Sequence, residues 1–413
     1  MSTQAPANGR PTTASFLRRV RIRDFKSIAH CDVELGPLTV LVGKNGSGKS
    51  NFVDALRFVS DELWMSAGAV IEDRRNVDMV RKGKGSPSGF ELELDVDVGD
   101  GRRAVYGFKY ASRGDHWPER VSEHLSISGA NGEVGAFYVV KNGQVQEFSE
   151  FERPPVPDDR LYLANASGFP VFREVYDALL GMQFYDLNPE AMSKLWNPSA
   201  VKFFVNDGRN IASVIGRLGS EQPELKKRIL EYLALIVPDI TDVNRAAFGP
   251  RETIEFTQEV PSSNTPRKFF AESMSDGTLR VLGTLVAATQ LAEGTGKVRL
   301  VGIEEPETAL HPAASAALMS ALQEAAVDGQ VIVTTHSPDL IDQLELDADR
   351  LLVVEMRDGE TVIGPIDRAS QETIKEQWYT PGQLLSMDQL VLDRIPFEPQ
   401  RKVRLAESAE PTE

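Results

Sequence analysis

One short stretch limits the possible folds of this chain more than any other. The residues GKNGSGKS, Gly43 to Ser50, fit the pattern G-x-x-x-x-G-K-[ST]. The apolar run LTVLVG precedes this stretch, and SNFVDALRFVSDEL, with apolar residues at helical spacing, follows it. Strand, glycine-rich loop and helix form the context in which this pattern cradles a phosphate, and a simple glycine turn is the alternative. We therefore expect a nucleotide site here.

The residue types in this loop indicate how a nucleotide would be held. The glycines let the backbone curl around phosphate oxygens. Lys49 is expected to reach the β- and γ-phosphates of ATP, and Ser50 to hold Mg²⁺. Nucleotide contacts are predicted for Gly43, Lys44, Asn45, Gly46, Ser47, Gly48, Lys49, Ser50 and Asn51.

Two further apolar runs end in charged or polar side chains. VRLVGI is followed by Glu304 and Glu305, and QVIVTT is followed by His336. Adjacent carboxylates at a strand end are costly unless a cation or a proton relay uses them. We expect Glu304 to support Mg²⁺, Glu305 to act as general base on the attacking water, and His336 to face the γ-phosphate. The alternatives are a solvated loop for the two glutamates and a structural role for His336.

The stretch ESMSDGTLR contains a second candidate anion site. Ser275 and Gly277 lie where the apolar run LRVLGTLVAATQLA begins, so backbone N–H groups are expected at the N-terminus of a buried helix. A Ser-Asp-Gly sequence is also an ordinary helix cap. Because GKNGSGKS already accounts for one nucleotide, the composition of the stretch alone leaves its ligand open.

Composition excludes several function classes. The chain has 61 acidic and 45 basic side chains and a formal charge of -16, so any nucleic-acid contact must be local. Its single cysteine excludes an intramolecular disulfide. The sequence has no membrane-spanning apolar stretch and no signal-peptide core, so we expect a soluble, cytoplasmic protein. Basic clusters, for which solvated strand faces are the alternative, occur at Arg18, Arg19, Arg21 and Arg23, and at Arg74, Arg75, Arg81, Lys82 and Lys84.

The order of these motifs resembles the ABC-class ATPases of the RecF/SMC/OLD branch, in particular stand-alone RecF-type AAA ATPases without a nuclease domain. By this resemblance GKNGSGKS is Walker A, MSDGTLR replaces the signature loop, GIEEPE is Walker B, ETALHP is the D-loop region and His336 is the switch histidine. Glu304 stands where most ABC proteins have Asp. The candidate Q-loop residues Gln144 and Gln146 belong to a predicted hairpin, which leaves one Mg²⁺ contact unassigned.

The resemblance implies an α/β fold: a P-loop NTPase with an ABC-type head, a mixed central sheet, an antiparallel β subdomain and an inserted helical lobe. Hairpin signals, helical periodicity and strand patterns follow one another along the chain in that order. The expected segments are a disordered N-terminus, 1–15, the N-terminal part of the ATPase head, 16–157, the helical lobe, 158–240, the C-terminal part of the head, 241–400, and a disordered tail, 401–413.

The resemblance also implies a use for the second anion site. In this class the signature loop faces the ATP of the other subunit, so Ser275 and Gly277 would complete a γ-phosphate site in a head-to-tail homodimer around two ATPs. The implied activity is ATP hydrolysis by a switch that acts on DNA or on a separate nuclease or effector chain, in repair or phage defence. The segment after His336 is short for a nuclease domain, so any nuclease is expected on another chain.

Two other function classes stay open at this point. The nucleotide-binding subunit of a membrane transporter would need a docking groove, which the sequence neither shows nor excludes. A P-loop kinase that phosphorylates a small molecule would leave the signature loop and His336 without roles. FKSI and EEPETALHP favour the RecF branch over both, by resemblance.

Overall fold

The glycine-rich loop connects a central strand to a long helix, as its flanking sequence predicts. The strand is β3 (Leu38–Val42) and the helix is α1 (Lys49–Trp64). Every residue of β3 is buried. Because side chains alternate across a strand, Leu41 contributes to the core on the α1 side of the sheet while Val40 contributes to the core on the other side.

The structure of the chain, a computed structural model, covers most of the sequence. The predicted disordered ends, 1–15 and 401–413, and the basic cluster between Arg74 and Lys84 lie outside the described residues. The described ranges are 16–65, 89–111, 119–157, 160–201, 203–259, 265–292, 298–346 and 348–393.

Parallel strands gather around β3. They are β9 (Met182–Tyr185), β13 (Leu300–Glu304), β14 (Gln330–Thr335) and β15 (Arg350–Arg357). β14 and β15 flank β3, β13 pairs with β14, and β9 pairs with β13, all in parallel. Since the carboxyl ends of parallel strands meet at one edge of a sheet, the residues that follow β3, β9, β13 and β14 are brought together there.

A second group of strands forms an antiparallel arm of the same sheet. Its hairpin turns lie at GDG, ANGE and KNGQ, where the sequence predicts them, and positive φ angles at Gly101, Gly132 and Gly143 suit the tight reversals. The strands are β1 (Leu17–Phe25), β2 (Ile28–Glu34), β4 (Gly89–Gly99), β5 (Arg102–Ala111), β6 (Glu119–Ser128), β7 (Val134–Lys141) and β8 (Gln144–Phe148).

One further strand joins the two groups into a single sheet. β16 (Glu360–Pro365) pairs with β15 antiparallel and with β2 in parallel. The sheet has 13 strands in the order β8-β7-β6-β5-β4-β1-β2-β16-β15-β3-β14-β13-β9. This mixed α/β sheet with an antiparallel arm confirms the predicted fold class.

The segment expected to be a helical lobe, 158–240, also supplies a strand to the main sheet. Its helices are α3 (Leu163–Ala166), α4 (Pro170–Leu180), α5 (Pro189–Ser193), α6 (Ile211–Glu221) and α7 (Pro223–Ile236). β9 interrupts them, because the short run MQFY finds a parallel partner in β13. α4 packs with α1, whereas α6 and α7 pack with a separate antiparallel sheet of β10 (Ile240–Phe248), β11 (Arg251–Gln258) and β12 (Arg267–Phe270).

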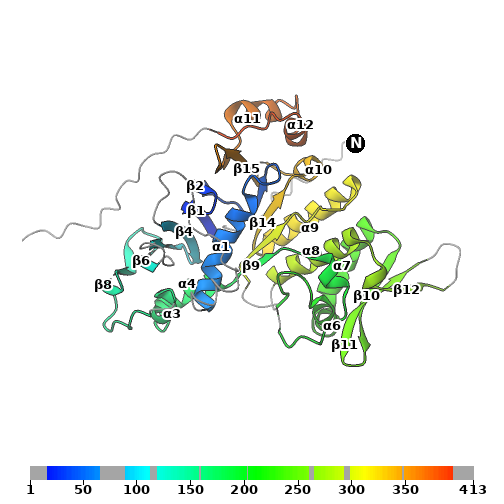
Figure 1. The fold of residues 1–413 in the computed structure, drawn as a ribbon, viewed down its shortest axis with the longest axis horizontal. Coiled ribbons are helices and arrows are strands. Elements are labelled where there is room, and N and C mark those ends of the chain that lie inside the picture. The colour runs from blue at the N-terminus through cyan, green and yellow to red at the C-terminus, as the bar shows by residue number, and fades with distance from the viewer. Residues whose placement is uncertain are drawn as a thin grey trace, which may run out of the picture.

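The remaining helices cover the second face and the end of the main sheet. α8 and α9 lie on the side of the sheet opposite α1, and α11 and α12 lie beyond β15 (Figure 1). Their bounds are α8 (Asp276–Ala288), α9 (Ser315–Asp328), α10 (Pro338–Ile341), α11 (Arg368–Lys375) and α12 (Pro381–Ser386). Within the described ranges, none of the helices has the length and apolar character that a membrane crossing requires.

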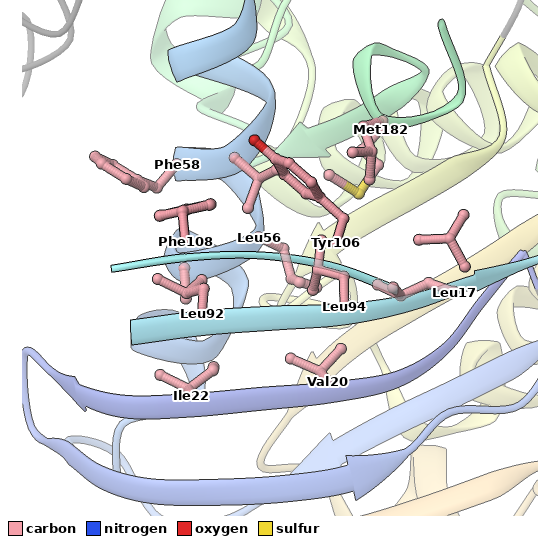
Figure 2. Packing of buried hydrophobic residues seen from close by; sticks show 14 of the residues in the cluster. Leu17, Val20, Ile22, Leu56, Phe58, Leu92, Leu94, Tyr106, Phe108 and Met182 are labelled. Atoms are coloured by element: carbon pink, nitrogen blue, oxygen red, sulfur yellow. The ribbon is translucent and has the colours of Figure 1, made fainter. Parts of the chain in front are cut away.

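The core on the α1 side is built from alternate residues of the antiparallel arm. Figure 2 shows Leu56 and Phe58 of α1 beside Leu92 of β4 and Phe108 of β5. Phe58 and Phe108 have ring centroids 6.0 Å apart. This packing ties the helix that begins at the glycine-rich loop to the arm.

A buried carboxylate holds the arm to α3. Glu123 of β6 is fully buried and accepts hydrogen bonds from the hydroxyls of Tyr106 (3.1 Å) and Tyr138 (2.8 Å). It also accepts the backbone N–H groups of Tyr162 (2.6 Å) and Leu163 (2.8 Å), where α3 begins. Burial and the neighbouring carboxylate raise the pKa of both hydroxyl groups well above the usual value.

We expect Glu123→Ala to lower the free energy of unfolding by about 3 to 5 kcal/mol, since it leaves the largely buried partner Arg120, 3.1 Å from the carboxylate, without its counter-charge. Urea unfolding of the full chain measures this loss. Glu147→Ala, at an exposed position of β8 in the same arm, is the matched control and should change stability by less than about 0.5 kcal/mol. Equal effects of the two substitutions would show that the Glu123 network contributes nothing.

Candidate functional site

The glycine-rich loop is held open by two left-handed residues and by a contact with β16. Gly46 has φ 76° and Gly48 has φ 103°. A Cβ atom added to Gly48 would lie 2.0 Å from Thr361 Oγ1, so only glycine fits there. Thr361 also donates to the carbonyl of Ser47 at 2.9 Å. These contacts fix the loop backbone in the curled form that phosphate binding requires.

The side chain of Lys49 folds back against the backbone of the glycine-rich loop. Its Nζ donates to the carbonyls of Gly43 (2.8 Å) and Lys44 (3.1 Å) and lies 3.9 Å from Glu305. Desolvation lowers the pKa of Lys49, and nearby carboxylates oppose this effect. Lys49 is thus a buried cation beside the loop, in a position to contact a bound phosphate group.

Asn51 and the turn between β1 and β2 form a second support of the loop. Asn51 Nδ2 donates to Ser27 Oγ at 2.6 Å, and Ser27 Oγ lies 2.6 Å from Thr361 Oγ1. Lys26 pairs with Asp54 of α1 at 2.6 Å. The sequence FKSI therefore attaches the first hairpin to the start of α1, and in this structure Asn51 contacts Ser27.

Glu304 ends β13 beside the start of α1. Ser50 lies close enough to its carboxylate to lower the pKa of that group, and Arg57 Nη2 donates to the carboxylate at 3.3 Å. Desolvation raises the pKa of Glu304, and Asp186 and Asp54 raise it further, while Ser50 and Arg57 oppose the rise. The two predicted Mg²⁺ residues are therefore adjacent.

Glu305 and His336 face each other across the ends of β13 and β14. His336 Nδ1 lies 3.6 Å from Glu305 Oε1. Glu305 has φ 42°, a left-handed backbone conformation that is unusual for a residue with a side chain, and its N–H donates to the carbonyl of Thr334 at 3.0 Å. Strained backbone of this kind is common at functional sites. The structure thus brings together Lys49, Glu304, Glu305 and His336.

A third carboxylate of EEPE has a role that sequence reasoning did not assign. Glu307 is buried, and its Oε1 accepts hydrogen bonds from Thr335 Oγ1 (2.5 Å) and from the backbone N–H of His336 (3.4 Å). Burial raises the pKa of Glu307. The residue fixes the end of β14 relative to Glu305. A third acidic residue so close to Glu304 and Glu305 was the signal that could have revealed it.

Asp186 is a second residue that the sequence did not single out. It follows β9 directly, and its charge is among those that raise the pKa of Glu304. Its signal was a polar residue at the end of an apolar run, but the four-residue strand was concealed between helices. Gln144 and Gln146 lie on β8, in the predicted hairpin.

Ser275 and Gly277 lie at the start of α8, as predicted. Ser275 is the N-cap residue, and its Oγ accepts from the N–H of Thr278 at 3.2 Å. A Cβ atom added to Gly277 would lie 2.4 Å from the carbonyl oxygen of Ala309, in the loop after β13. The structure therefore gives both residues a local role, and within the described ranges Ser275 makes no hydrogen bond to the glycine-rich loop.

The basic cluster of β1 is matched by acidic side chains. Arg19 pairs with Asp32 at 2.6 Å, Arg21 pairs with Glu93, and Arg18 lies 4.0 Å from Asp97. These pairs favour the alternative interpretation for the three arginines, in which they lie on a solvated strand face.

The residues at this sheet edge fit ATP and Mg²⁺ chemically. The loop backbone and Lys49 suit phosphate oxygens, and the hydroxyl of Ser50 and carboxylate of Glu304 are oxygen ligands of the kind Mg²⁺ prefers. No three His, Cys, Asp or Glu side chains in the described ranges form a metal cage. Mg²⁺ bound together with nucleotide phosphates needs only one or two protein ligands.

Comparison with known protein families identifies the family of this chain. The family described as "AAA domain, putative AbiEii toxin, Type IV TA system" matches residues 38–342, which include every residue of the predicted site. The chain belongs to this family. Together with the relatives described next, this match confirms the predicted resemblance to the ABC-class ATPases of the RecF/SMC/OLD branch.

Curated relatives of this AAA domain protein come from the same branch. It is 24% identical over 394 residues to the OLD nuclease of Thermus scotoductus, covering 89% of this chain and 68% of that protein. It is 36% identical over 70 residues to the DNA replication and repair protein RecF of Gloeobacter violaceus, covering 17% of each. A 181-residue match to the chromosome partition protein Smc of Desulfitobacterium hafniense is 31% identical and covers 39% of this chain and 14% of that one.

Solved structures confirm the fold of the family member. An Smc head bound to the C-terminal winged-helix domain of ScpA has a TM-score of 0.52 at 15% identity and covers 86% of this chain and 99% of that chain. An Smc head with an extended coiled coil, bound to the C-terminal domain of ScpA and derived from Pyrococcus furiosus, has a TM-score of 0.51 at 14% identity and covers 88% and 99%. The α/β architecture is therefore that of an SMC head.

Proposed function

We propose that this protein binds Mg²⁺-ATP and hydrolyses it to ADP and phosphate. The observation that carries the proposal is the meeting of Lys49, Glu305 and His336 at one sheet edge, with Nζ to Oε1 and Nδ1 to Oε1 distances of 3.9 Å and 3.6 Å. A cation for phosphate, a carboxylate and a histidine are the groups that hydrolysis of a phosphoanhydride uses.

Each residue has a distinct part in the proposed reaction. Lys49 and the loop N–H groups bind the phosphates, and Glu305 accepts the proton of the attacking water. His336 donates a hydrogen bond to the γ-phosphate from the opposite strand end, held there by Glu307. Mg²⁺, when bound by Ser50 and Glu304, would neutralise charge that develops on the phosphate oxygens.

The proposed unit of function is a head-to-tail homodimer around two ATPs. Ser275 and Gly277 support this proposal, since they begin α8, an apolar helix of 13 residues whose N–H groups suit an anion. The loop Gly43–Ser50 already serves the nucleotide of its own subunit, so the phosphate at α8 would belong to the partner's nucleotide. Hydrolysis would then open the dimer and make it a switch.

The proposed target of the switch is DNA or a separate effector chain, in DNA repair or defence against phage. The named functions of RecF, Smc and the OLD nuclease support a role with DNA. The described part of the chain offers no specific observation that favours a transporter partner. The measurement that tests this proposal is phosphate release with and without single-stranded, duplex and gapped DNA. Absence of hydrolysis under all conditions would contradict the ATPase, and unstimulated hydrolysis would indicate a protein effector.

Lys49→Ala is expected to weaken nucleotide binding about 10 to 100-fold, because it removes a charged donor to the phosphates. Titration with a fluorescent ATP analogue measures the affinity. Lys227→Ala is the matched control: its side chain is exposed on α7 and pairs with Glu231 at 3.7 Å, away from the glycine-rich loop, so nucleotide affinity should stay unchanged. Unchanged affinity in Lys49→Ala would remove this lysine from the site.

A further inference from the structure

Arg57 lies on the same face of α1 as Ser50, two helical turns further along. Its Nη2 donates to Glu304 at 3.3 Å, and its guanidinium carbon lies 5.9 Å from the centre of the Phe184 ring on β9. The proposed hydrolysis assigns no function to this arginine. It nevertheless contacts the carboxylate that is the proposed Mg²⁺ ligand.

The burial of Glu304 and the carboxylates near it favour a cation at this point. Its side chain is only 13% exposed, and the carboxylates of Asp186 and Asp54 act on it electrostatically. Asp54 is itself paired with Lys26 at 2.6 Å. Three carboxylates therefore lie near the end of β13, and Arg57 is the cation in contact with Glu304.

The contact between Arg57 and Glu304 is of a kind that can be exchanged. Elsewhere in this chain Arg19 donates two hydrogen bonds to the Asp32 carboxylate, of 2.6 Å and 2.9 Å, in the usual bidentate geometry. Arg57 reaches Glu304 with one nitrogen at 3.3 Å, and its buried Nε has no hydrogen-bond partner in the described part of the chain. The Phe184 ring offers a cation–π contact that would keep the guanidinium in place if the carboxylate turned away.

We propose that Arg57 is a positioning residue, a counter-charge that competes with a divalent cation for Glu304. The inference rests on the proposed function, since it takes Glu304 as the metal ligand. Arg57 contacts neither the glycine-rich loop nor Glu305 in the described ranges, so it acts through Glu304. Arg57 holds the Glu304 carboxylate beside Ser50 and weakens metal binding in the absence of nucleotide. When a nucleotide is bound, its phosphates supply the additional negative charge that a metal ion needs at this site.

The test is Mn²⁺ binding to the purified full chain without nucleotide, followed by the loss of the free Mn²⁺ EPR signal. Arg57→Gln is expected to bind Mn²⁺ roughly tenfold more tightly than the wild type, because a positive charge close to the ligand is gone. Arg57→Lys keeps the charge and should stay within about twofold of the wild type. Arg19→Gln is the matched control for loss of an arginine–carboxylate pair and should leave Mn²⁺ affinity unchanged.

Two further variants make the result specific. Adding Glu304→Gln to Arg57→Gln should abolish the gain in affinity. Arg57→Met, which keeps an apolar stem against Phe184, replaces Arg57→Gln if thermal melting shows that the latter does not fold. Unchanged or weaker Mn²⁺ binding after loss of the charge, including no measurable binding by either protein, would overturn the proposal. A parallel titration with a fluorescent ATP analogue separates this outcome from failure of the proposed ATPase, in which the wild type would bind no nucleotide.

Discussion

Replacing Glu305 by glutamine is expected to leave ATP binding intact and to slow hydrolysis about 10² to 10⁴-fold, the range of general-base catalysis. Glutamine keeps the shape of the side chain and its hydrogen-bonding ability but cannot accept the proton of the attacking water. The position of Glu305 supports the role of general base, since this residue lies between the buried Lys49 and His336. Single-turnover phosphate release measures the chemical step, and a fluorescent ATP analogue measures binding.

The consequence for assembly gives a second readout. If ATP closes the dimer and hydrolysis opens it, Glu305→Gln should accumulate as an ATP-bound dimer in size-exclusion chromatography. Glu190→Gln is the matched control, because Glu190 is an exposed glutamate of α5 that pairs with Lys194. A normal turnover rate in Glu305→Gln would mean that Glu305 is structural, and the base would then have to be sought at Glu304 or His336.

The parts of the site that are contiguous in sequence could be predicted. The motif Gly43–Ser50 lies between an apolar run and a helical pattern, and the structure has β3 and α1 there. Polar residues at the ends of two apolar runs indicated Glu304 and His336, because parallel strands end at a common edge. Local patterns and one topological rule were sufficient for these residues.

The parts that depend on strand order could not be predicted. β9 is four residues long and lies between helices, so the polar residue after it was too weak a local signal to predict the pairing of β9 with β13, and hence the place of Asp186. β16 bridges the parallel strands and the antiparallel arm, and this position brings Thr361 against Gly48 across more than 300 residues of sequence. The contact between Arg57 and Glu304 likewise arises from tertiary packing. Long-range pairing of this kind leaves no periodicity in the sequence.

The predicted signature residues have two compatible roles, which must be separated by experiment. Ser275 caps α8, so its replacement would cost about 1 kcal/mol of stability even if it never touched a phosphate. Ser275→Ala removes the cap without adding bulk and is therefore the matched control. We expect Ser275→Ala to retain much of the hydrolysis rate, whereas Ser275→Arg should bind ATP and hydrolyse it at least about 10²-fold more slowly, because an arginine blocks closure onto the partner's phosphate.

Mixing two inactive proteins tests whether the site is shared between subunits. A Ser275→Arg subunit has an intact glycine-rich loop, and a Lys49→Ala subunit has an intact α8 N-terminus. In their heterodimer one site combines the two intact parts and the other combines both damaged parts. At equal amounts, random pairing places about one quarter of the wild-type number of intact sites in the mixture, so phosphate release should recover toward that level and peak near equal mixing. Full activity of Ser275→Arg by itself would return this loop to the role of a helix cap, because α8 would then be capped and packed against Ala309 without completing any neighbour's site.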